Sequence, residues 1–461
     1  MKKVCIQGLG FVGSAMATAV AAAKDNNGLA YFNVVGIDLP TKQGQYRVDK
    51  INQCEFPYTT SDENLLSVFK QSCENGCLTA TTNIDIYAEA EIIIVDIQLD
   101  IPYLDDEPQL QLESFRIAIE SIGQKVKEGT LIIIETTVPP GTCEKVVVPI
   151  LEMELRKRGL NSKNIHIAHS YERVMPGEDY LASIIDYWRV FAGYTQQAGD
   201  ICEAFLSKVI NVNDYPLTRL SSTTASETAK VMENSYRAAN IAFIDEWTKF
   251  SEAVGIDLFE IVSAIKKRPT HSNIRFPGLG VGGYCLTKDP TFAPAAARQL
   301  FAKDLDFPFS ELTVRTNNNM PLHTVERLKK LLSGSLQDKK ILICGVSYRQ
   351  DVGDTRYSPS EMLVRELVSG GANIQLHDPY VEHWDEMELS VSNEILISQD
   401  LDAIVFAVPH KAYQTMDLAK MVKTNLTVIL DANCVFNKLQ RDHVREKGLR
   451  IESIGIGNNN I

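Results

Sequence analysis

One cysteine in this chain stands where its chemistry could be used. Residues 277–290 place Cys285 directly behind a run of glycines and three residues ahead of Lys288, which Asp289 follows. Glycine lets the backbone approach a ligand closely, and a neighbouring cation lowers the pKa of a thiol towards the reactive thiolate. A thiolate adds to carbonyl carbon, so the segment predicts covalent catalysis. The alternative is a glycine loop with a buried cysteine, in which Asp289 caps a helix that begins at Pro290.

A strand, a glycine turn and a helix at the start of the chain predict a dinucleotide-binding unit. The apolar residues 3–7 lead into Gly8, Gly10 and Gly13, and an Ala-rich helical stretch, 14–24, follows. Gly8 permits the tight turn, Gly10 leaves room for a pyrophosphate, and Gly13 lets the helix pack closely on the strand. The helix N-terminus then faces the phosphates with unpaired N–H groups. The residues expected to contact the cofactor in this turn are Gly8, Gly10, Phe11, Val12 and Gly13.

An acidic residue ends the next predicted strand. Residues 34–38 are an apolar run that finishes at Asp38, and a carboxylate in this position hydrogen-bonds the adenosine ribose and repels a 2′-phosphate. This favours NAD over NADP. The spacing from the glycines is longer than usual, so we expect residues 25–32 to form a loop. The alternative is that Asp38 only caps the end of the strand.

Two further apolar runs predict the centre of a parallel sheet. Residues 91–95 and 130–134 lack the alternation of a half-exposed strand, and a helical stretch, 110–127, lies between them. Continuous apolar runs suit strands that are covered on both faces. The second run leads into a loop, 135–142, that contains Thr137. Ligands bind just beyond the carboxyl ends of such strands, although this loop could also be an ordinary turn.

Length and composition exclude several classes of protein. A chain of 461 residues is long enough for two or three domains. Its net charge of −13 argues against a nucleic-acid surface. The nine cysteines are scattered, which suits a reducing cytoplasm, and after Cys73 and Cys77 no second pair follows at metal-ligand spacing. No apolar run reaches the roughly 18 residues of a membrane helix, so we expect a soluble cytoplasmic protein without a metal.

Taken in order, these segments resemble the UDP-glucose/GDP-mannose dehydrogenase family, the NAD-dependent nucleotide-sugar 6-dehydrogenases. The resemblance covers nearly the whole chain. Besides the glycine turn, the Thr137 loop and the Cys285 segment, it rests on residues 170–177, on the helical stretch 225–237 and on residues 345–359.

The resemblance implies an α/β fold with two Rossmann-like, doubly wound parallel-sheet domains joined by a helical middle domain with a long central helix. An NAD-binding domain would span residues 1–208. A helical dimerisation domain carrying the cysteine would span 209–325, and a nucleotide-sugar-binding domain 326–461. The residues support this plan, because 225–254 contains no Pro or Gly and reads as one long helix. A new strand and turn begin at 340–345 with a single glycine, so the second sheet need not hold a dinucleotide.

The family reaction oxidises the C6 alcohol of a nucleotide sugar to a carboxylate with two molecules of NAD, and the resemblance assigns a role to particular residues. Cys285 matches the nucleophile. Lys230 and Asn234, at i and i+4, share one helix face and would stabilise an alkoxide. Glu172 and Thr137 would orient the hydrolytic water, Asp289 is the acid near the thiol, and Lys288 is expected on the cofactor side. The expected substrate contacts are Arg356, Arg349, Arg275, Gly282 and Tyr284, with Arg268 as an alternative to Arg275.

Several positions depart from the family pattern and bear on the substrate. Arg349 stands where the family usually has Lys, and the two are not interchangeable at a bidentate site. Residues 96–100 replace a stretch that usually supplies a threonine to the cofactor. Tyr284 resembles the UDP-glucose enzymes, whereas 277–278 and 173–177 resemble members that act on UDP-N-acetylhexosamines. We therefore expect a UDP-N-acetylhexosamine such as UDP-ManNAc, with UDP-glucose as the alternative.

Two alternative functions, which belong to other classes of protein, stay open. A two-electron β-hydroxyacid dehydrogenase has a similar domain plan, but one hydride transfer needs neither Cys285 nor a second nucleotide domain. A non-catalytic protein that binds NAD and a nucleotide sugar would not need Cys285, Lys230, Asn234 and Asp289 together. We expect an enzyme that forms a homodimer or a higher homo-oligomer and makes a uronate precursor of a surface polysaccharide.

Overall fold

The structure is a computed structural model that describes residues 1–99, 103–104, 107–395, 401–422 and 426–457. The chain divides into two compact units. The first unit comprises Met1–Glu233 with Thr291–Asp306, and the second comprises Asn234–Pro290 with Phe307–Ile461. The division falls inside the long helix α8 (Thr223–Val254), which confirms the predicted uninterrupted helix. The boundaries of the three expected domains stay a prediction.

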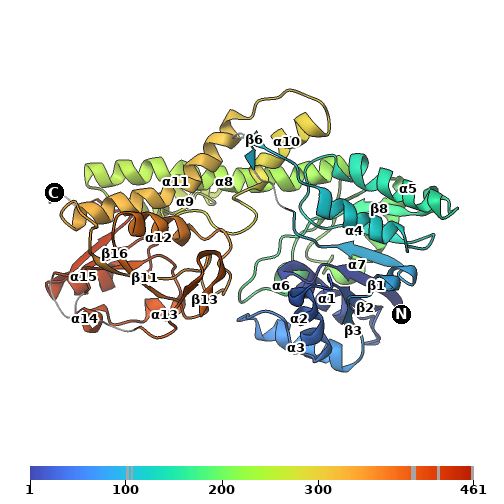
Figure 1. Ribbon diagram of the computed structural model, residues 1–461, viewed down its shortest axis with the longest axis horizontal. Helices are drawn as coiled ribbons and strands as arrows, with labels where there is room; N and C mark the ends of the chain where they lie inside the picture. Colours follow the sequence, from blue (N-terminus) through green and yellow to red (C-terminus); the bar gives the residue numbers. More distant parts are fainter. Residues whose placement is uncertain (100–102, 105–106, 396–400, 423–425, 458–461) are drawn as a thin grey trace. The chain divides into compact units, whose positions relative to one another are not determined.

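The first unit is built on an eight-stranded sheet with the order β10-β9-β8-β7-β4-β1-β2-β3 (Figure 1). Its strands are β1 (Lys2–Gln7), β2 (Phe32–Ile37), β3 (Leu78–Thr81), β4 (Ile92–Val95), β7 (Leu131–Ile134), β8 (His166–His169), β9 (Val190–Gly193) and β10 (Thr218–Arg219). All pairs from β3 to β8 are parallel, and β9 runs antiparallel to β8. A parallel run of this kind has the strand order of a dinucleotide-binding fold.

Helices cover both faces of this sheet. They are α1 (Phe11–Ala22), α2 (Lys42–Asn52), α3 (Glu63–Glu74), α4 (Glu113–Gly123), α5 (Val148–Lys157), α6 (Ala182–Ile185), α7 (Gln196–Val209) and α10 (Phe292–Gln299), and a short hairpin pairs β5 (Tyr103–Leu104) with β6 (Glu107–Pro108). Successive residues of β1 face opposite cores. Val4 and Ile6 share a core with α1, α3 and α7, whereas Cys5 shares one with α4 and α5. The central strands β4, β7 and β8 are buried along their whole length, which explains the continuous apolar runs of β4 and β7.

The second unit contains a five-stranded, wholly parallel sheet with the order β12-β11-β15-β16-β17. Its strands are β11 (Lys340–Cys344), β12 (Asn373–His377), β15 (Ala403–Phe406), β16 (Val428–Asp431) and β17 (Arg450–Ser453), and β13 (His383–Trp384) pairs separately with β14 (Leu389–Ser390). The helices are α9 (Leu258–Lys266), α11 (Pro308–Leu331), α12 (Pro359–Ser369), α13 (Lys411–Gln414), α14 (Leu418–Met421) and α15 (Lys438–Glu446).

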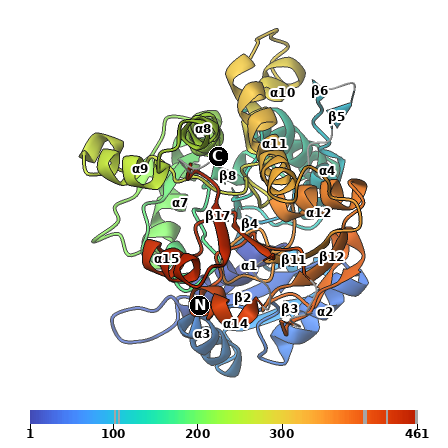
Figure 2. The same ribbon diagram turned by 90° about the vertical axis from the view of Figure 1, so that its left-hand side faces the viewer.

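The second sheet is also covered on both faces. In Figure 2, α12 lies above β11 and β12, and α14 lies below them. Ile341 and Ile343 share a core with α11 and α12, whereas Leu342 and Cys344 share one with α14 and α15. The expectation of two doubly wound parallel sheets is thus confirmed. In the part of the chain that the structure describes, no helix is both long enough and apolar enough to cross a membrane.

Candidate active site

The glycine turn between β1 and α1 has the geometry of a phosphate-binding turn. Gly8 has a φ of +94°, and a Cβ on it would lie 2.2 Å from the carbonyl oxygen of Asp96. A Cβ on Gly13 would lie 1.8 Å from the carbonyl oxygen of Gly8, whereas one on Gly10 would meet nothing within 4 Å. Packing therefore requires Gly8 and Gly13, and Gly10 faces open space. Gly10 is the N-cap of α1 and makes no side-chain capping bond, so the first turn of the helix can receive an anion.

Asp38 lies beside this turn, as predicted. Its Oδ2 accepts hydrogen bonds from the Leu9 N–H (3.3 Å) and from Nε of Arg47 (2.8 Å), and its Oδ1 accepts one from the Leu39 N–H (2.7 Å). Arg47, on α2, was not anticipated from the sequence. It orients the carboxylate at the place where a ribose would bind. The residues of the turn and Asp38 together fit NAD, and they would hold its pyrophosphate and adenosine ribose.

Lys230 is buried on α8 and surrounded by residues that follow β8. Its Nζ donates a hydrogen bond to the backbone carbonyl of Glu172 (2.7 Å) and lies 3.7 Å from the Glu172 carboxylate. The ammonium also lies 5.4 Å from the centroid of the Tyr171 ring, which is a cation–π distance. The side chain of Lys230 is only 7% exposed. The buried ammonium of Lys230 thus lies beside Glu172, whereas Arg173 pairs with Glu233.

A second polar group lies in the second unit around the predicted nucleophile. Asn234, one turn beyond Lys230 along α8, donates from Nδ2 to Oδ2 of Asp289 at 2.6 Å. Nζ of Lys288 lies 3.1 Å from Oδ1 of Asp289 and 4.2 Å from the centroid of the Tyr284 ring. The N–H of Asp289 donates to the Cys285 carbonyl at 2.9 Å. Cys285 itself is exposed, so the alternative of a glycine loop with a buried cysteine does not hold.

The glycines before Cys285 allow one loop to lie on another. A Cβ on Gly282 would lie 2.7 Å from Cδ of Pro359 and 2.9 Å from Cβ of Tyr348. Gly283 has a φ of +83°, and a Cβ there would lie 2.7 Å from the Tyr348 ring. These glycines therefore pack against residues 345–359, the other segment expected to bind substrate. Contact of Gly282 with a ligand stays a prediction.

Three arginines of the second unit concentrate positive charge near the thiol. Desolvation of the guanidinium and the charges of Arg275 and Arg349 lower the pKa of Arg237, and Cys285 and Tyr348 also lie close enough to act on it. Nε of Arg275 is buried and has no hydrogen-bond partner in the described part of the chain. Such a cluster favours an anionic ligand. Sequence reasoning named Arg275 and Arg349 but missed Arg237, although it stands three residues after Asn234 on the same helix.

Arg356 is oriented by its own neighbour. Its Nη2 pairs with Oδ2 of Asp354 at 2.7 Å and its Nε donates to Oδ1 at 3.0 Å, while its Cζ lies 5.8 Å from the Tyr284 ring centroid. Arg356 and Lys288 thus both lie near the ring of Tyr284. Arg268 is exposed and precedes a short 3₁₀ turn.

Thr137 lies in a loop that α8 holds through a buried carboxylate. Glu227 accepts hydrogen bonds from the N–H groups of Gly141 (2.6 Å) and Cys143 (2.7 Å). Burial raises the pKa of Glu227 to about 7, against the effect of the hydrogen bonds from Cys143 and Gly141. Sequence reasoning missed Glu227, because its partners lie 86 and 84 residues away.

The stretch that departs from the family pattern after β4 is held by a different threonine. Thr136 accepts a hydrogen bond from the Ile97 N–H through Oγ1 at 2.9 Å. Asp96 lies near Glu135, and burial together with the charge of Glu135 raises the pKa of Asp96 well above its usual range. Asp100 lies outside the described residues. A group of three or more His, Cys, Asp or Glu side chains that could hold a metal ion is not found in the described residues.

Comparison with protein-family models gives three matches in chain order. Residues 2–210 match the NAD binding domain of the UDP-glucose/GDP-mannose dehydrogenase family, residues 224–319 match its central domain, and residues 342–438 match its UDP binding domain. Together these matches cover most of the chain.

Individual relatives align over nearly their whole length. UDP-N-acetyl-D-mannosamine dehydrogenase of Methanocaldococcus jannaschii is 29% identical, over 99% of this chain and 97% of its own. The structure of the UDP-D-ManNAc dehydrogenase of Pyrococcus horikoshii superposes with a TM-score of 0.82 at 25% identity, and covers 99% of this chain and 100% of its own. The NDP-N-acetyl-D-galactosaminuronic acid dehydrogenase of Methanosarcina mazei superposes with a TM-score of 0.79 at 25% identity, covering 99% and 96%.

Proposed function

The chain belongs to the UDP-glucose/GDP-mannose dehydrogenase family, and we propose that it catalyses the four-electron oxidation of a nucleotide sugar at C6. Family membership makes it an oxidoreductase that uses NAD. When bound, NAD would supply the oxidising power by taking up a hydride in each of two steps. The glycine turn and Asp38 would hold this cofactor, and Thr137 and Lys288 are the further candidates for contact with it.

Lys230 and Asn234 act on the alcohol in this proposal. Removal of a hydride from C6 requires that the hydroxyl lose its proton, and an ammonium and an amide stabilise the developing alkoxide. Lys230 is suited to this role because Glu172 and the Tyr171 ring hold its Nζ in place. Asn234 is similarly oriented by Asp289.

Cys285 acts on the aldehyde. Its thiolate adds to the aldehyde carbon and forms a C–S bond, which gives a thiohemiacetal, and loss of the second hydride from that carbon gives a thioester. Water, oriented by Glu172 and Thr137, attacks the thioester carbon, the C–S bond breaks and the thiolate is restored. One alcohol, one water and two NAD⁺ thus give one carboxylic acid, two NADH and two protons.

We propose a UDP-N-acetylhexosamine such as UDP-ManNAc as the substrate. The UDP binding domain match covers most of the second sheet, and relatives that align along the whole chain are UDP-N-acetyl-D-mannosamine dehydrogenases. The segments 173–177 and 277–278 favour the same choice. UDP-glucose, suggested by Tyr284, is the alternative. The charge of Arg237, Arg275 and Arg349 would attract the diphosphate or the product carboxylate, and Arg356 would contact the same ligand.

The observation that carries the proposal is an exposed Cys285 on a turn fixed by Asp289, which in turn orients Asn234. The test is to incubate the protein with NAD and a panel of UDP- and GDP-sugars, to weigh the products and to count NADH. Two NADH per uronate support the proposal. One NADH per product would indicate the two-electron dehydrogenase, and nucleotide-sugar binding without NADH would indicate the non-catalytic protein.

We also propose a homodimer in the cytoplasm that supplies a uronate for a surface polysaccharide. One face of the second-unit part of α8 exposes large apolar side chains at helical spacing. They are Tyr236 (59% exposed), Phe243 (52%), Trp247 (45%), Phe250 (51%) and Val254 (49%). A continuous apolar stripe on one helix suits a second copy of the same helix, because a two-fold interface joins identical surfaces.

A further inference from the structure

The strand order of the second sheet marks one place for a ligand. The strand order is β12-β11-β15-β16-β17, so β12 is added on one side of β11 and the strands after β15 are added on the opposite side. The neighbouring strands β11 and β15 therefore form a topological switch point, and ligands bind beyond the carboxyl ends of the two strands at such a point. The loop after β11, residues 345–358, carries Arg349 and Arg356. The segment after β15 carries His410.

Unlike the turn after β1, the turn after β11 does not offer its backbone N–H groups to a phosphate. Oδ2 of Asp378 accepts hydrogen bonds from the N–H groups of Val346 (2.9 Å) and Ser347 (3.1 Å). The next helix, α12, begins only at Pro359, and its N-cap Ser358 already accepts a bond from the Ser360 N–H. A diphosphate at this switch point must therefore be held by side chains of the loop, and the conformation of the loop decides where those side chains lie.

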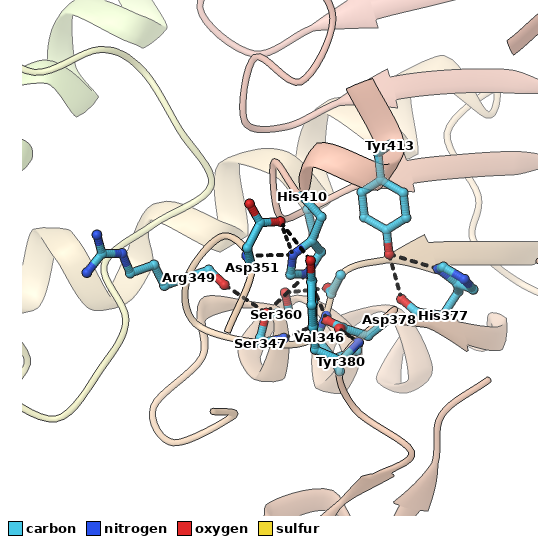
Figure 3. Close-up of polar contacts among 12 residues, drawn as sticks. Val346, Ser347, Arg349, Asp351, Ser360, His377, Asp378, Tyr380, His410 and Tyr413 are labelled. Atoms are coloured by element: carbon cyan, nitrogen blue, oxygen red, sulfur yellow. Dashed lines mark hydrogen bonds and ion pairs between the residues drawn. The ribbon is translucent and has the colours of Figure 1, made fainter. Parts of the chain in front are cut away.

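His410 fixes that conformation. The N–H of Asp351 donates to Nδ1 of His410 at 2.9 Å, and Nε2 of His410 lies 3.1 Å from Oδ2 of Asp378 and 3.2 Å from Oγ of Ser347 (Figure 3). The ring is completely buried. Figure 3 shows His410 amid these groups and the Arg349 side chain extending away from them. One imidazole thus joins the start of the loop, its middle and the end of β12.

The hydrogen bonds define the tautomer and exclude a nucleophilic serine. Because Nδ1 accepts a bond from a backbone N–H, the ring proton is on Nε2, where it can be donated to Asp378. The Ser347 hydroxyl donates to the carbonyl of Arg349 at 3.0 Å. In a Ser-His-Asp triad the serine and the acid bind opposite ring nitrogens. Here both contact Nε2, so the three residues support a loop and do not form a hydrolytic site.

The loop needs this support because its backbone is strained. Asp351 has a φ of +56° and Tyr357 a φ of +52°, in the left-handed region that is unfavourable for a non-glycine residue. Asp351 is held through both its backbone and its side chain. Its N–H donates to Nδ1 of His410, and its Oδ1 accepts a hydrogen bond from the Lys411 N–H at 3.0 Å. Strained residues that are held in this way cluster at ligand sites.

We propose that His410 is a positioning residue that holds loop 345–358 so that Arg349 and Arg356 meet the diphosphate of the nucleotide sugar. The inference rests on the proposed function. It concerns binding rather than chemistry, because the imidazole is buried and, among the residues that the structure describes, its hydrogen bonds and ring contacts are with the loop, Asp378 and neighbouring rings.

The experiment compares His410→Leu, His410→Gln and His377→Leu. Leu fills space but offers no hydrogen bond, whereas the Gln amide offers an acceptor oxygen and a donor nitrogen, which can replace the acceptor and donor nitrogens of the imidazole. His377→Leu is the matched control: His377 is equally buried, but its ring binds Tyr413 (2.8 Å) and the Asn393 carbonyl (3.2 Å) instead of the loop. The readouts are the Kd of UDP by calorimetry, KM and kcat for the active nucleotide sugar, the Kd of NAD, and Tm.

For His410→Leu we expect the Kd of UDP and KM to rise about tenfold or more, with kcat at saturation within about threefold of the wild type and NAD binding unchanged. His410→Gln should recover most of the UDP affinity, and His377→Leu should keep it. Unchanged UDP affinity in a folded His410→Leu would overturn the proposal, as would an equal loss in His377→Leu. If His410→Leu does not fold, the UDP affinity of His410→Gln decides the question. An affinity close to that of the wild type supports the role of His410, and a rise of about tenfold or more in the Kd of UDP contradicts it. UDP binding tests His410 even if no sugar yields NADH, so the two proposals can fail separately.

Discussion

Nδ2 of Asn234 donates a 2.6 Å hydrogen bond to Oδ2 of Asp289, 55 residues further along the chain. The bond joins α8 to the turn that carries Cys285, and both partners are buried. The helix and the turn therefore hold the proposed alkoxide-binding amide and the proposed nucleophile in one fixed arrangement within the second unit.

Removal of this amide should cost stability. In Asn234→Ala the buried Asp289 carboxylate loses a partner, and an unsatisfied buried acceptor costs about 1–3 kcal/mol. Thermal denaturation of Asn234→Ala, Asp289→Asn and the double variant measures the coupling. We expect the two effects to be non-additive, because each single variant breaks the same bond. Strict additivity would show that the bond does not contribute.

Cys285→Ser should block acid formation and leave NAD binding intact. A serine hydroxyl is not ionised as a thiolate is, so the thiohemiacetal and the thioester do not form. Product analysis by mass spectrometry should detect no uronate, and Tm should stay near the wild-type value because Cys285 is exposed. Cys77→Ser, at another accessible cysteine, should retain full activity. Full uronate production by Cys285→Ser would remove the covalent route.

Gly10→Val should abolish NAD binding without unfolding the first unit. A Cβ on Gly10 meets nothing within 4 Å, so the added side chain enters open space, which is where we propose that the pyrophosphate binds. We expect the Kd of NAD to rise more than tenfold while Tm changes little. Gly13→Val is the contrasting variant, because its Cβ would lie 1.8 Å from the Gly8 carbonyl oxygen and should disrupt the fold. Wild-type NAD affinity in Gly10→Val would place the cofactor elsewhere.

His169 should make the first unit sensitive to acid. Burial and the charge of Lys230 lower the pKa of His169 to about 3. In the unfolded chain the pKa of His169 is about 6.5. Below this pH the unfolded chain binds a proton that the folded protein does not bind, so the free energy of unfolding decreases by about 1.4 kcal/mol for each unit by which the pH is lowered. Between pH 6.5 and pH 5 this amounts to about 2 kcal/mol. Nδ1 of His169 lies 2.8 Å from Oγ of Ser226, and a Gln side chain also offers that hydroxyl a polar partner. His169→Gln should therefore lose less stability over this range than the wild type, with no such difference in slope between pH 7 and pH 8. An identical acid sensitivity would contradict the prediction.

The apolar stripe of α8 should control assembly. Phe243→Lys and Trp247→Lys replace exposed rings with charges, which a dry interface does not tolerate. We expect a dimer for the wild type and a monomer for the double variant in size-exclusion chromatography with light scattering. Lys substitution of Ile117, an exposed apolar residue of the first unit, is the control and should stay dimeric. A monomeric wild type would refute the proposed interface.

The secondary structure and the class of fold could be predicted from the residues alone. The apolar run of β1, the glycines after it and the uninterrupted helix α8 follow from local rules of backbone geometry and periodicity, and the structure confirms each of them. The helix predicted for residues 110–127 is shorter, Glu113–Gly123, and β17 was missed because its alternating residues do not stand out from their surroundings. The family resemblance named the site residues, but it did not identify the groups that hold them.

Those groups were decided by tertiary structure. Arg47 at Asp38, Glu172 and Tyr171 at Lys230, Glu227 at the Thr137 loop and His410 at loop 345–358 are contacts between different elements. Most of them lie tens of residues apart in the chain. A local pattern reports how a segment folds and which face it buries. The partner of a buried charge depends on which distant segment the sheet order brings beside it, and no local pattern contains that information.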